Sequence, residues 1–588
     1  MNSTRLTFEH LLYALALLLA LTLRLLNLGV SPLAEGEAEL ALPAYQISGG
    51  ERPDFGAQPG YTALTSLTFA LLPSSEFTAR LWPALLGATL ALIPFFFRRW
   101  LGRETALVLA FGLALDPGLV AVSRQVGSPV LALVFTLLAL GFALNDLSVL
   151  AGIAAGLALL SGPPLLPGLV GLALAWGASR VFYVTPSEAE EEEHLAAWTR
   201  FDSSGLRQGV VAMLVTLLLV GTIFLRLPQG LSAWLAGLPA YLSGWGHFLG
   251  VPALRLLAAL VIYQPLSLVF GLVGALRGWL RGDRLAQALS YWFIFALLLA
   301  LIYPARQVGD LAWALLPMWA LAAMELKRTL RWEFSQPVIT LAQTALLFIL
   351  MVLIWLNLAG LGQSSPEAPD YLTRLVLVVG VIALGGVASA LVGLGWSWQA
   401  SRQGLVWAVC AALGLYTLAG LWWSTQLHVP GRVELWQPSP ASSDSRLLEN
   451  TLDDISRWKT GEPASIDITV ALDSPALHWA LRTYSRLTLL PEGEQLLAVG
   501  SPSVVITSQN VKEPSLAASY RGQDFVLRTY PGWSGPLPPN FPQWLVFRLA
   551  PQQQVQVILW VRADLFPGGE AQSESNLPQT NLPQLDSP

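Results

Sequence analysis

Three glutamates alternate with small residues just after the first long apolar run of the chain. They are Glu35, Glu37 and Glu39. A carboxylate is costly to place beside a bilayer, so a cluster there indicates a functional site. One of the three could act as the general base that removes a proton from a hydroxyl group. The alternative is a solvated helix start, where the helix dipole favours acidic side chains.

The same carboxylates could hold a divalent cation weakly through oxygen ligands. No other metal site is predicted, because the five histidines show no ligand spacing. Cys410 is the only cysteine, which excludes an internal disulfide and a cysteine zinc site. We therefore predict no cofactor beyond such a cation.

Membrane helices must position these acids. Hydrophobic residues make up 54% of the 588-residue chain and charged residues only 12%, whereas a soluble domain has about 25% charged residues. Of the 71 charged residues, 27 lie in the last 161 positions. The net charge of −5 and the absence of a basic run exclude a nucleic-acid partner. These features predict a polytopic membrane domain over residues 1–427, followed by a soluble part.

Thirteen apolar runs are candidate membrane spans. The first begins near Phe8 and is not followed by the small-residue cleavage site of a signal peptide. Gly162-Pro163-Pro164 divides one long apolar stretch into two short ones. The predicted spans are 8–28, 77–97, 104–121, 129–146, 147–161, 165–179, 209–226, 254–276, 285–303, 310–325, 337–360, 371–396 and 404–425.

The distribution of basic residues predicts the orientation. With a cytoplasmic N-terminus, the inner segments hold 14 Lys and Arg residues, and the outer segments hold at most eight. An odd number of spans then places residues 428–588 outside the cell (plasma) membrane.

Two predicted outer loops are more than simple connectors. The first, residues 29–76, contains an apolar helix over 60–73 that is too short to span and should be interfacial or re-entrant. The second, residues 227–253, is suited either to anchoring at the membrane interface or to stacking on a sugar. Its aromatic residues at near-helical spacing are Trp234, Tyr241 and Trp245.

Residues 428–565 alternate between helix and strand patterns, which predicts a small extracytoplasmic α/β domain. The predicted helices are 447–459 and 475–484, and the predicted strands are 465–472, 486–490, 503–508, 524–528 and 554–561. No nucleophile, metal or phosphate-loop motif occurs there, so we expect a supporting or recognition role. Residues 566–588 are rich in Pro, Gln, Ser and Asn and are predicted to be disordered.

Several segments together resemble a known class of membrane enzymes. They are RLLNLGVSPLAEGEAELALPA, QPGYTALTSLTFALLPSSEFTARLWPALLG, SRQVGSPVLAL and IYPARQVGDLAWALLPMWALAAMEL. These segments resemble GT-C membrane glycosyltransferases of family 39, the protein mannosyltransferase and aminoarabinose transferase type. The C-terminal HWALRTY, PSVVIT, YRGQDFVLR and ILWVRADLF resemble a flippase-associated branch with an extracytoplasmic tail domain.

The resemblance implies transfer of a sugar from a polyprenyl-phosphate donor to a protein, lipid or glycan hydroxyl on the outer face, with inversion. An Asp-Glu pair in the first outer loop would supply the catalytic carboxylate. Here that pair reads Gly36-Glu37, so Glu37 matches the second acid and Glu35 could replace the first. Pro129 stands where the family often has a second Asp, and Ser161-Gly162-Pro163 where it often has a lysine.

Basic and polar residues complete the site that the resemblance implies. Arg124 and Arg306 lie in predicted outer loops where a lipid phosphate would sit, and a guanidinium can contact phosphate through two nitrogens. The alternatives are loop orientation, or for Arg306 an ion pair with an acid such as Asp310. Positions that match the family around the acceptor and donor cleft are Gln58, Tyr61 and Arg80. Packing of the first two, and pairing of Arg80 with an outer-loop acid, are the alternatives.

Two functions remain after this comparison. The first is a membrane glycosyltransferase with Glu37 as base and Arg124 and Arg306 holding the phosphate. The second, motivated by the missing acids, is a catalytically degenerate relative that binds or helps translocate lipid-linked glycans. A small-solute transporter is disfavoured, because no Gly- or Pro-broken spans recur at matching places in two halves.

Overall fold

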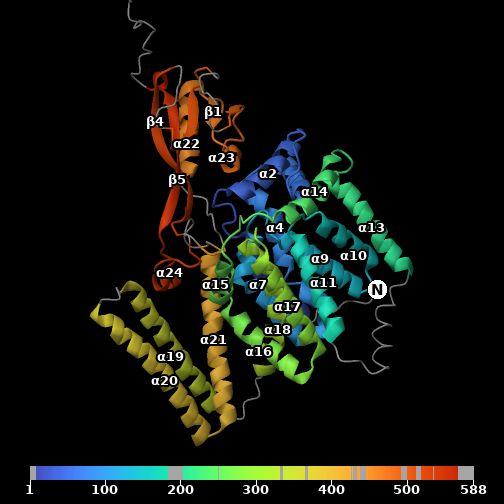
Figure 1. Cartoon of the computed structure of the whole chain (residues 1–588), viewed down its shortest axis with the longest axis vertical. Coiled ribbons are helices and arrows are strands. Elements are labelled where there is room, and N and C mark those ends of the chain that lie inside the picture. The colour runs from blue at the N-terminus through green and yellow to red at the C-terminus, as the bar shows by residue number, and fades with distance from the viewer. Residues whose placement is uncertain are drawn as a thin grey trace, which may run out of the picture. The chain divides into compact units, whose positions relative to one another are not determined.

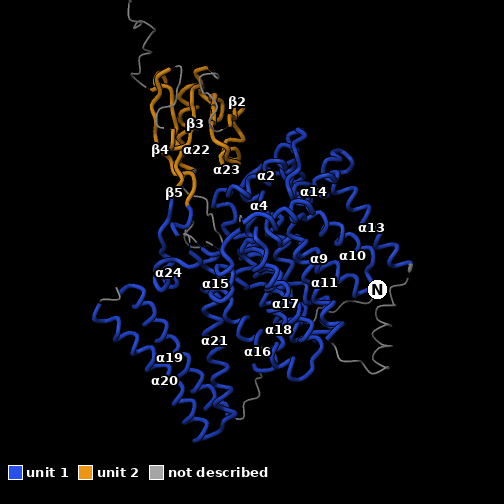
Figure 2. The backbone as a smooth tube through the Cα atoms, viewed as in Figure 1, with its two compact units in different colours: residues 1–440, 530–553 blue, residues 441–529, 554–588 orange. Residues whose placement is uncertain are grey.

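The computed structural model describes residues 8–182, 203–248, 250–330, 336–364, 368–425, 427, 434–436, 445–491, 500–511, 518–533 and 535–566. The chain divides into two compact units, residues 1–440 with 530–553, and residues 441–529 with 554–588 (Figure 2). The tail predicted to be disordered lies, beyond Phe566, outside the described residues.

The boundary predicted at residue 428 differs from this division. Residues 530–553 belong to the helical unit, because the short helix α24 (Phe541–Phe547) packs against α19 (Pro337–Gln363). The chain therefore leaves the second unit after residue 529 and returns to it at residue 554.

The first unit consists of helices joined mostly by short loops (Figure 1). Besides α19 and α24, they are α1 (Phe8–Leu25), α2 (Glu35–Ser48), α3 (Pro59–Leu71), α4 (Glu76–Thr89), α5 (Ile93–Phe96), α6 (Arg98–Leu101), α7 (Arg103–Leu115), α8 (Pro117–Ser123), α9 (Val130–Leu144), α10 (Ser148–Leu159), α11 (Leu165–Phe182), α13 (Ser203–Gly221), α14 (Gln229–Ser243), α15 (Ala253–Tyr263), α16 (Pro265–Arg281), α17 (Arg284–Ile302), η1 (Val308–Leu311), α18 (Ala312–Thr329), α20 (Pro369–Gly395) and α21 (Trp398–Ser424).

Among the described residues, eight helices are long and apolar enough to cross a membrane, or up to ten if two bent pairs each count as one span. The bends are 56° between α7 and α8 and 94° between α15 and α16. Pro117 and Pro265 are the first residues of the second helix in each pair, and a proline cannot continue the hydrogen bonding of the helix before it. Each predicted apolar run falls on a helix or a bent pair, but a count of thirteen spans is not confirmed.

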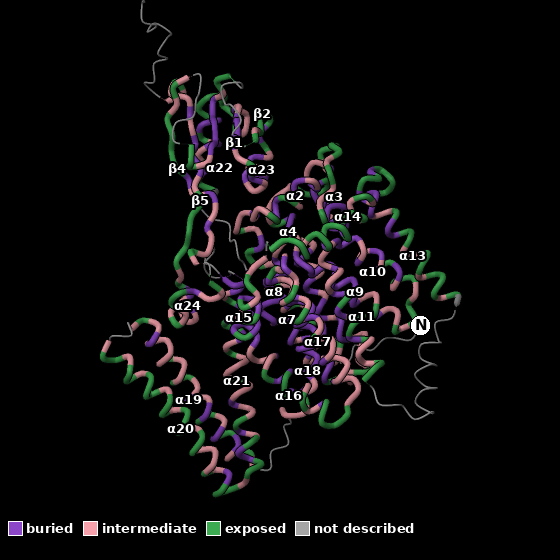
Figure 3. The backbone as a smooth tube through the Cα atoms, viewed as in Figure 1, coloured by how far each residue is buried: buried purple, intermediate pink, exposed green. Residues whose placement is uncertain are grey.

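Helix α18 forms the centre of the unit, and most of its residues are buried (Figure 3). It packs against α16, α17 and α7. Close approach depends on glycine: a Cβ at Gly112 or Gly168 would lie less than 3 Å from the rings of Trp319 or Trp313. In contrast, the most apolar 18-residue window of α20 contains no buried residue, as expected for a helix that faces lipid.

The second unit is a small α/β structure, as the sequence predicted. Its five-stranded sheet has the order β2-β1-β3-β5-β4, in which β1 is parallel to β2 and β3, and β3 is antiparallel to β5. The strands are β1 (Asp467–Ala471), β2 (Arg486–Leu489), β3 (Val504–Ser508), β4 (Tyr520–Pro531) and β5 (Gln552–Arg562). Apolar residues of α22 (Ser445–Thr460) and α23 (Pro475–Ala480) share one buried cluster with strand residues such as Ile468 and Ile506.

Candidate functional site

Loops and short helices far apart in the sequence meet at one end of the helical unit. The Gly60 N–H, in α3, donates to the Leu160 carbonyl at 2.8 Å. The Gln58 side chain donates to the Gly127 carbonyl at 3.0 Å. We call this region the loop end; it comprises α2, α3, the loop 124–129, η1, and α14 with the start of α15.

Glu37 and Arg80 form a buried ion pair at the loop end. Arg80 donates from Nε to Glu37 Oε1 at 2.9 Å and from Nη2 to Oε2 at 2.5 Å. The remaining Arg80 donors bind the carbonyls of Leu28, Ser31 and Pro32. The pairing expected for Arg80 is therefore present, and all five guanidinium donors are used inside the protein.

Glu37 is also fully committed. Its Oε2 accepts from the Ala34 N–H and its Oε1 from the Val126 N–H, each at 3.0 Å. Together with the two bonds from Arg80, four donors occupy the four lone-pair sites of a carboxylate. Glu37 thus joins α2, α4 and the loop 124–129, and in this arrangement it has no lone pair left for a proton from substrate.

The three alternating glutamates do not converge on one point. They start α2, and on a helix residues four apart share a face whereas residues two apart do not. Glu39 is exposed, Glu35 is half-buried and Glu37 is buried. No group of three possible metal ligands occurs among the described residues. A divalent cation, which these acids could have held weakly by the sequence reasoning, therefore does not fit their geometry.

Gly36, where the resemblance expects an aspartate, is exposed in the first turn of α2. A Cβ built on it would meet nothing within 4 Å. The glycine is therefore not required by packing or by its backbone conformation.

The two arginines predicted to bind phosphate both hold loop backbone. Arg124 donates from Nη1 to the carbonyls of Leu23, Arg24 and Leu26, which closes the end of α1. Arg306 donates to the carbonyls of Val251 and Tyr303, at 2.9 Å each. In both residues Nη2 makes no hydrogen bond to another described residue.

Gln58 and Tyr61 are both buried beside α4 and the loop 124–129. Tyr61 is fully buried and donates its hydroxyl to the Ala79 carbonyl at 2.8 Å. Gln58 is 3% exposed, and its Oε1 is buried without a hydrogen-bond partner among the described residues. Tyr61 is thus placed as a packing residue, whereas Gln58 retains an unused acceptor.

Arg255 is a candidate site residue that the sequence analysis did not identify. Arg255 lies in the first turn of α15 and is 6% exposed. Its Nε and Nη2 are buried without a partner, and no ion pair to Arg255 occurs among the described residues. A buried guanidinium without a counter-charge is costly, so this position suits an anion that the chain itself does not supply.

Asp310, considered in the sequence only as a partner for Arg306, does not form that ion pair. Its Oδ2 accepts from the Gln307 N–H at 2.8 Å, which starts η1. Burial raises the pKa of Asp310 to about 6, against the effect of the Gln307 hydrogen bond.

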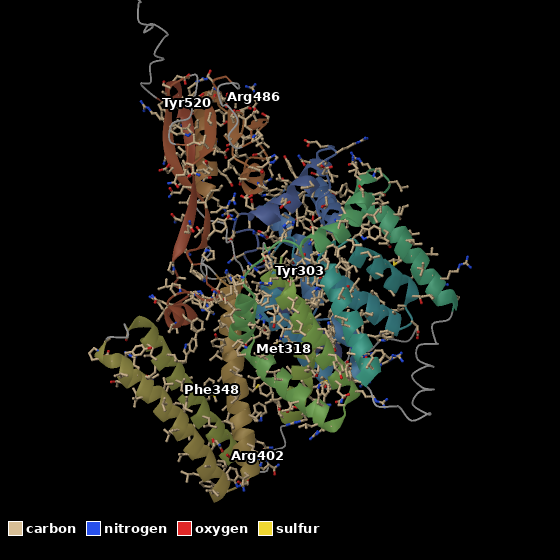
Figure 4. The ribbon with its side chains drawn as sticks, viewed as in Figure 1. Tyr303, Met318, Phe348, Arg402, Arg486 and Tyr520 are labelled. Atoms are coloured by element: carbon tan, nitrogen blue, oxygen red, sulfur yellow. The ribbon has the colours of Figure 1, made fainter. Side chains whose placement is uncertain are left out.

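Aromatic residues of the second predicted outer loop meet the end of α17. The rings of Tyr241 and Tyr303 stack at 4.9 Å, and Trp245 packs edge-on against Tyr303 at 5.4 Å (Tyr303 is labelled in Figure 4). Trp245 is 40% exposed. We call Tyr241, Trp245 and Tyr303 the aromatic shelf.

No protein-family model matches the chain, and no curated protein matches it. Solved structures do match it, and two of them are crystal structures of ArnT from Cupriavidus metallidurans, one bound to undecaprenyl phosphate and one in the apo state. The TM-scores are 0.55 and 0.54, at 15% identity, over 93% of this chain and 97% of that chain. The chain therefore shares the membrane-protein fold of these structures over nearly its whole length.

Proposed function

We propose that this protein is a membrane glycosyltransferase that moves a sugar from a polyprenyl-phosphate donor to a hydroxyl acceptor on the outer face of the membrane. The observation that carries the proposal is Arg255 at the loop end of a GT-C fold, a buried cation whose Nε and Nη2 have no hydrogen-bond partner in the described part of the chain. Likeness over nearly the whole chain to an ArnT structure bound to undecaprenyl phosphate supports the same class of ligand.

The phosphate is held by guanidinium nitrogens that the protein leaves unused. Arg255 offers Nε and Nη2. Arg306 offers Nη2, while its Nε donates to the carbonyl of Val251, a residue four positions before Arg255. Arg124 offers Nη2 from the loop 124–129, whose Pro129 lies against Gly309. Planar guanidinium groups suit a phosphate because they can contact two of its oxygens at once.

The Glu37–Arg80 pair has a positioning role in this proposal. It fixes the chain 28–32, the start of α2 and the loop 124–129 to one another. Glu35, in the same first turn, is half-buried beside the open position at Gly36.

The test uses the purified chain in lipid nanodiscs with a panel of radiolabelled polyprenyl-phosphate sugars. Bound donor and released polyprenyl phosphate are both measured, with and without Mg²⁺ or Mn²⁺. Release coupled to glycosylation of an added acceptor is expected. Binding without release across the panel, with the cations present, would contradict transfer and leave a protein that only binds or helps translocate lipid-linked glycans.

A further inference from the structure

Asp310 has one carboxylate oxygen committed and one free. Its Oδ2 accepts from the Gln307 N–H. No hydrogen bond or ion pair to Oδ1 occurs among the described residues. The side chain is half-buried, so an acid with an unused acceptor lies in a partly closed position.

The surroundings of Asp310 belong to the loop end. A Cβ on the neighbouring Gly309 would lie 3.3 Å from Pro129, and Pro129 ends the loop whose Val126 N–H binds Glu37. Helix η1 also packs against α15, which carries the unpaired Arg255. A free carboxylate oxygen and an unpaired guanidinium therefore lie on two elements in direct contact.

Helix η1, which carries Asp310, packs against α17, and the C-cap residue of α17 is Tyr303 of the aromatic shelf. The Tyr303 hydroxyl donates to the Tyr241 carbonyl at 3.1 Å, so these two stacked rings are held together. Trp245 adds a partly exposed ring. Aromatic rings with one open side and a nearby polar group suit the apolar face of a sugar.

We propose that Asp310 is the general base of the sugar transfer, and that the aromatic shelf beside it receives the sugar ring that carries the acceptor hydroxyl. This inference rests on the proposed function and replaces Glu37 in the catalytic role.

Asp310 Oδ1 takes the proton of the acceptor hydroxyl while the acceptor oxygen forms a bond to the anomeric carbon of the donor sugar. The bond between that carbon and the phosphate oxygen breaks, and its electron pair leaves with the polyprenyl phosphate. Attack opposite the leaving group inverts the anomeric centre, and Asp310 then releases its proton to water.

The electrostatic environment supports this role. A pKa of about 6, raised by burial, leaves Asp310 ionised at neutral pH and closer in basicity to the optimum for a base acting there than an ordinary aspartate is. The titratable groups on the elements around it are Tyr241, Tyr303, Arg306 and, on α15, Arg255.

The variant Asp310→Asn tests the proposal in full-length protein in nanodiscs. An asparagine keeps an oxygen that can accept from the Gln307 N–H, so η1 stays capped, but it cannot take a proton. Release of polyprenyl phosphate should fall by about 100-fold or more, with donor-lipid affinity within about threefold of wild type. Asp310→Glu should restore part of the rate with a shifted acidic limb of the pH–rate profile.

The matched control is Asp54→Asn, an exposed acid of the loop 29–76, which should release at the wild-type rate. Release by Asp310→Asn within threefold of wild type would overturn the inference, as would loss of release in Glu35→Gln with Asp310→Asn still active. A wild-type protein that binds donor but never releases product would instead refute the proposed transfer, and this inference with it.

Discussion

Replacing Arg255 by methionine should separate ligand binding from folding. Methionine keeps most of the apolar stem of the side chain and removes the charge. Nε and Nη2 of Arg255 are buried and have no hydrogen-bond partner among the residues that the structure describes, and each unsatisfied buried donor costs about 1–3 kcal/mol. Without lipid, Arg255→Met should therefore unfold at the same temperature as wild type or at a higher one.

Binding of lipid phosphate should respond in the opposite direction. Removing one partner of a buried charge pair costs about 2–5 kcal/mol, which corresponds to an affinity loss of about 30-fold to several thousand-fold. The lipid-phosphate affinity of Arg255→Lys should lie between the affinities of wild type and Arg255→Met. An ammonium keeps the charge but lacks the planar pair of donors that a phosphate can use.

The assay is titration of undecaprenyl phosphate into nanodiscs that hold each variant, with thermal unfolding measured on the same samples before lipid is added. Arg52→Met is the matched control, because Arg52 is an exposed arginine of the loop 29–76. Unchanged affinity in Arg255→Met would refute the phosphate site. A fall of several degrees in the unfolding temperature of the lipid-free variant would show that Arg255 has a structural partner and would refute the reasoning from its missing hydrogen bonds.

Three further predictions concern the neighbouring acids and the second unit. Glu37→Gln should lower the free energy of unfolding by about 3–5 kcal/mol, because the buried Arg80 loses its counter-charge; loss of product release at unchanged unfolding temperature would return the catalytic role to Glu37. Gly36→Asp should leave the unfolding temperature unchanged, since the position is open and lies where the helix dipole favours an acid; a large fall would contradict the open geometry. In the second unit, burial would raise the pKa of Asp467, but hydrogen bonds from the Ser503 hydroxyl and N–H outweigh it and lower the pKa. The stability that Asp467 contributes is therefore fully present above the unfolded aspartate value of about 3.9 and is lost as the pH falls through the lower folded value; hydrogen exchange of β1 and β3 amides should show this acid sensitivity in wild type and a smaller one in Asp467→Asn.

Apolar periodicity and strand alternation predicted most elements, because each depends on residues close together in the chain. The short helix over 60–73 appears as α3, and the predicted strands 465–472 and 554–561 appear as β1 and β5. The sequence did not reveal where residues 530–553 belong. Their place in the helical unit depends on contacts between α24 and α19, which lie about 200 residues apart in the sequence. A pattern of neighbouring residues cannot predict such a contact.

The one feature of the site that the sequence predicted correctly is an ion pair between buried residues of opposite charge. Arg80 was expected to meet an acid of the first loop, and it meets Glu37. Arg255 and Asp310 stand out for the reverse reason, since Nε and Nη2 of Arg255 and Oδ1 of Asp310 have no hydrogen-bond partner among the described residues. A partner that is missing can be recognised only after the neighbours are known. The one signal in the sequence was an arginine inside the otherwise apolar segment ALRLLAALVIY.

Glu37 and Asp310 differ in how many hydrogen-bond donors their carboxylates accept. Four donors converge on Glu37, so its charge stabilises three chain segments and is no longer available to take a proton. The open position at Gly36 contributes nothing to that arrangement. A general base needs a lone pair without a donor and a site that excludes part of the solvent. Asp310 meets both conditions, because a single backbone donor binds its Oδ2. The structural role of Glu37 and the proposed base role of Asp310 therefore belong to different residues.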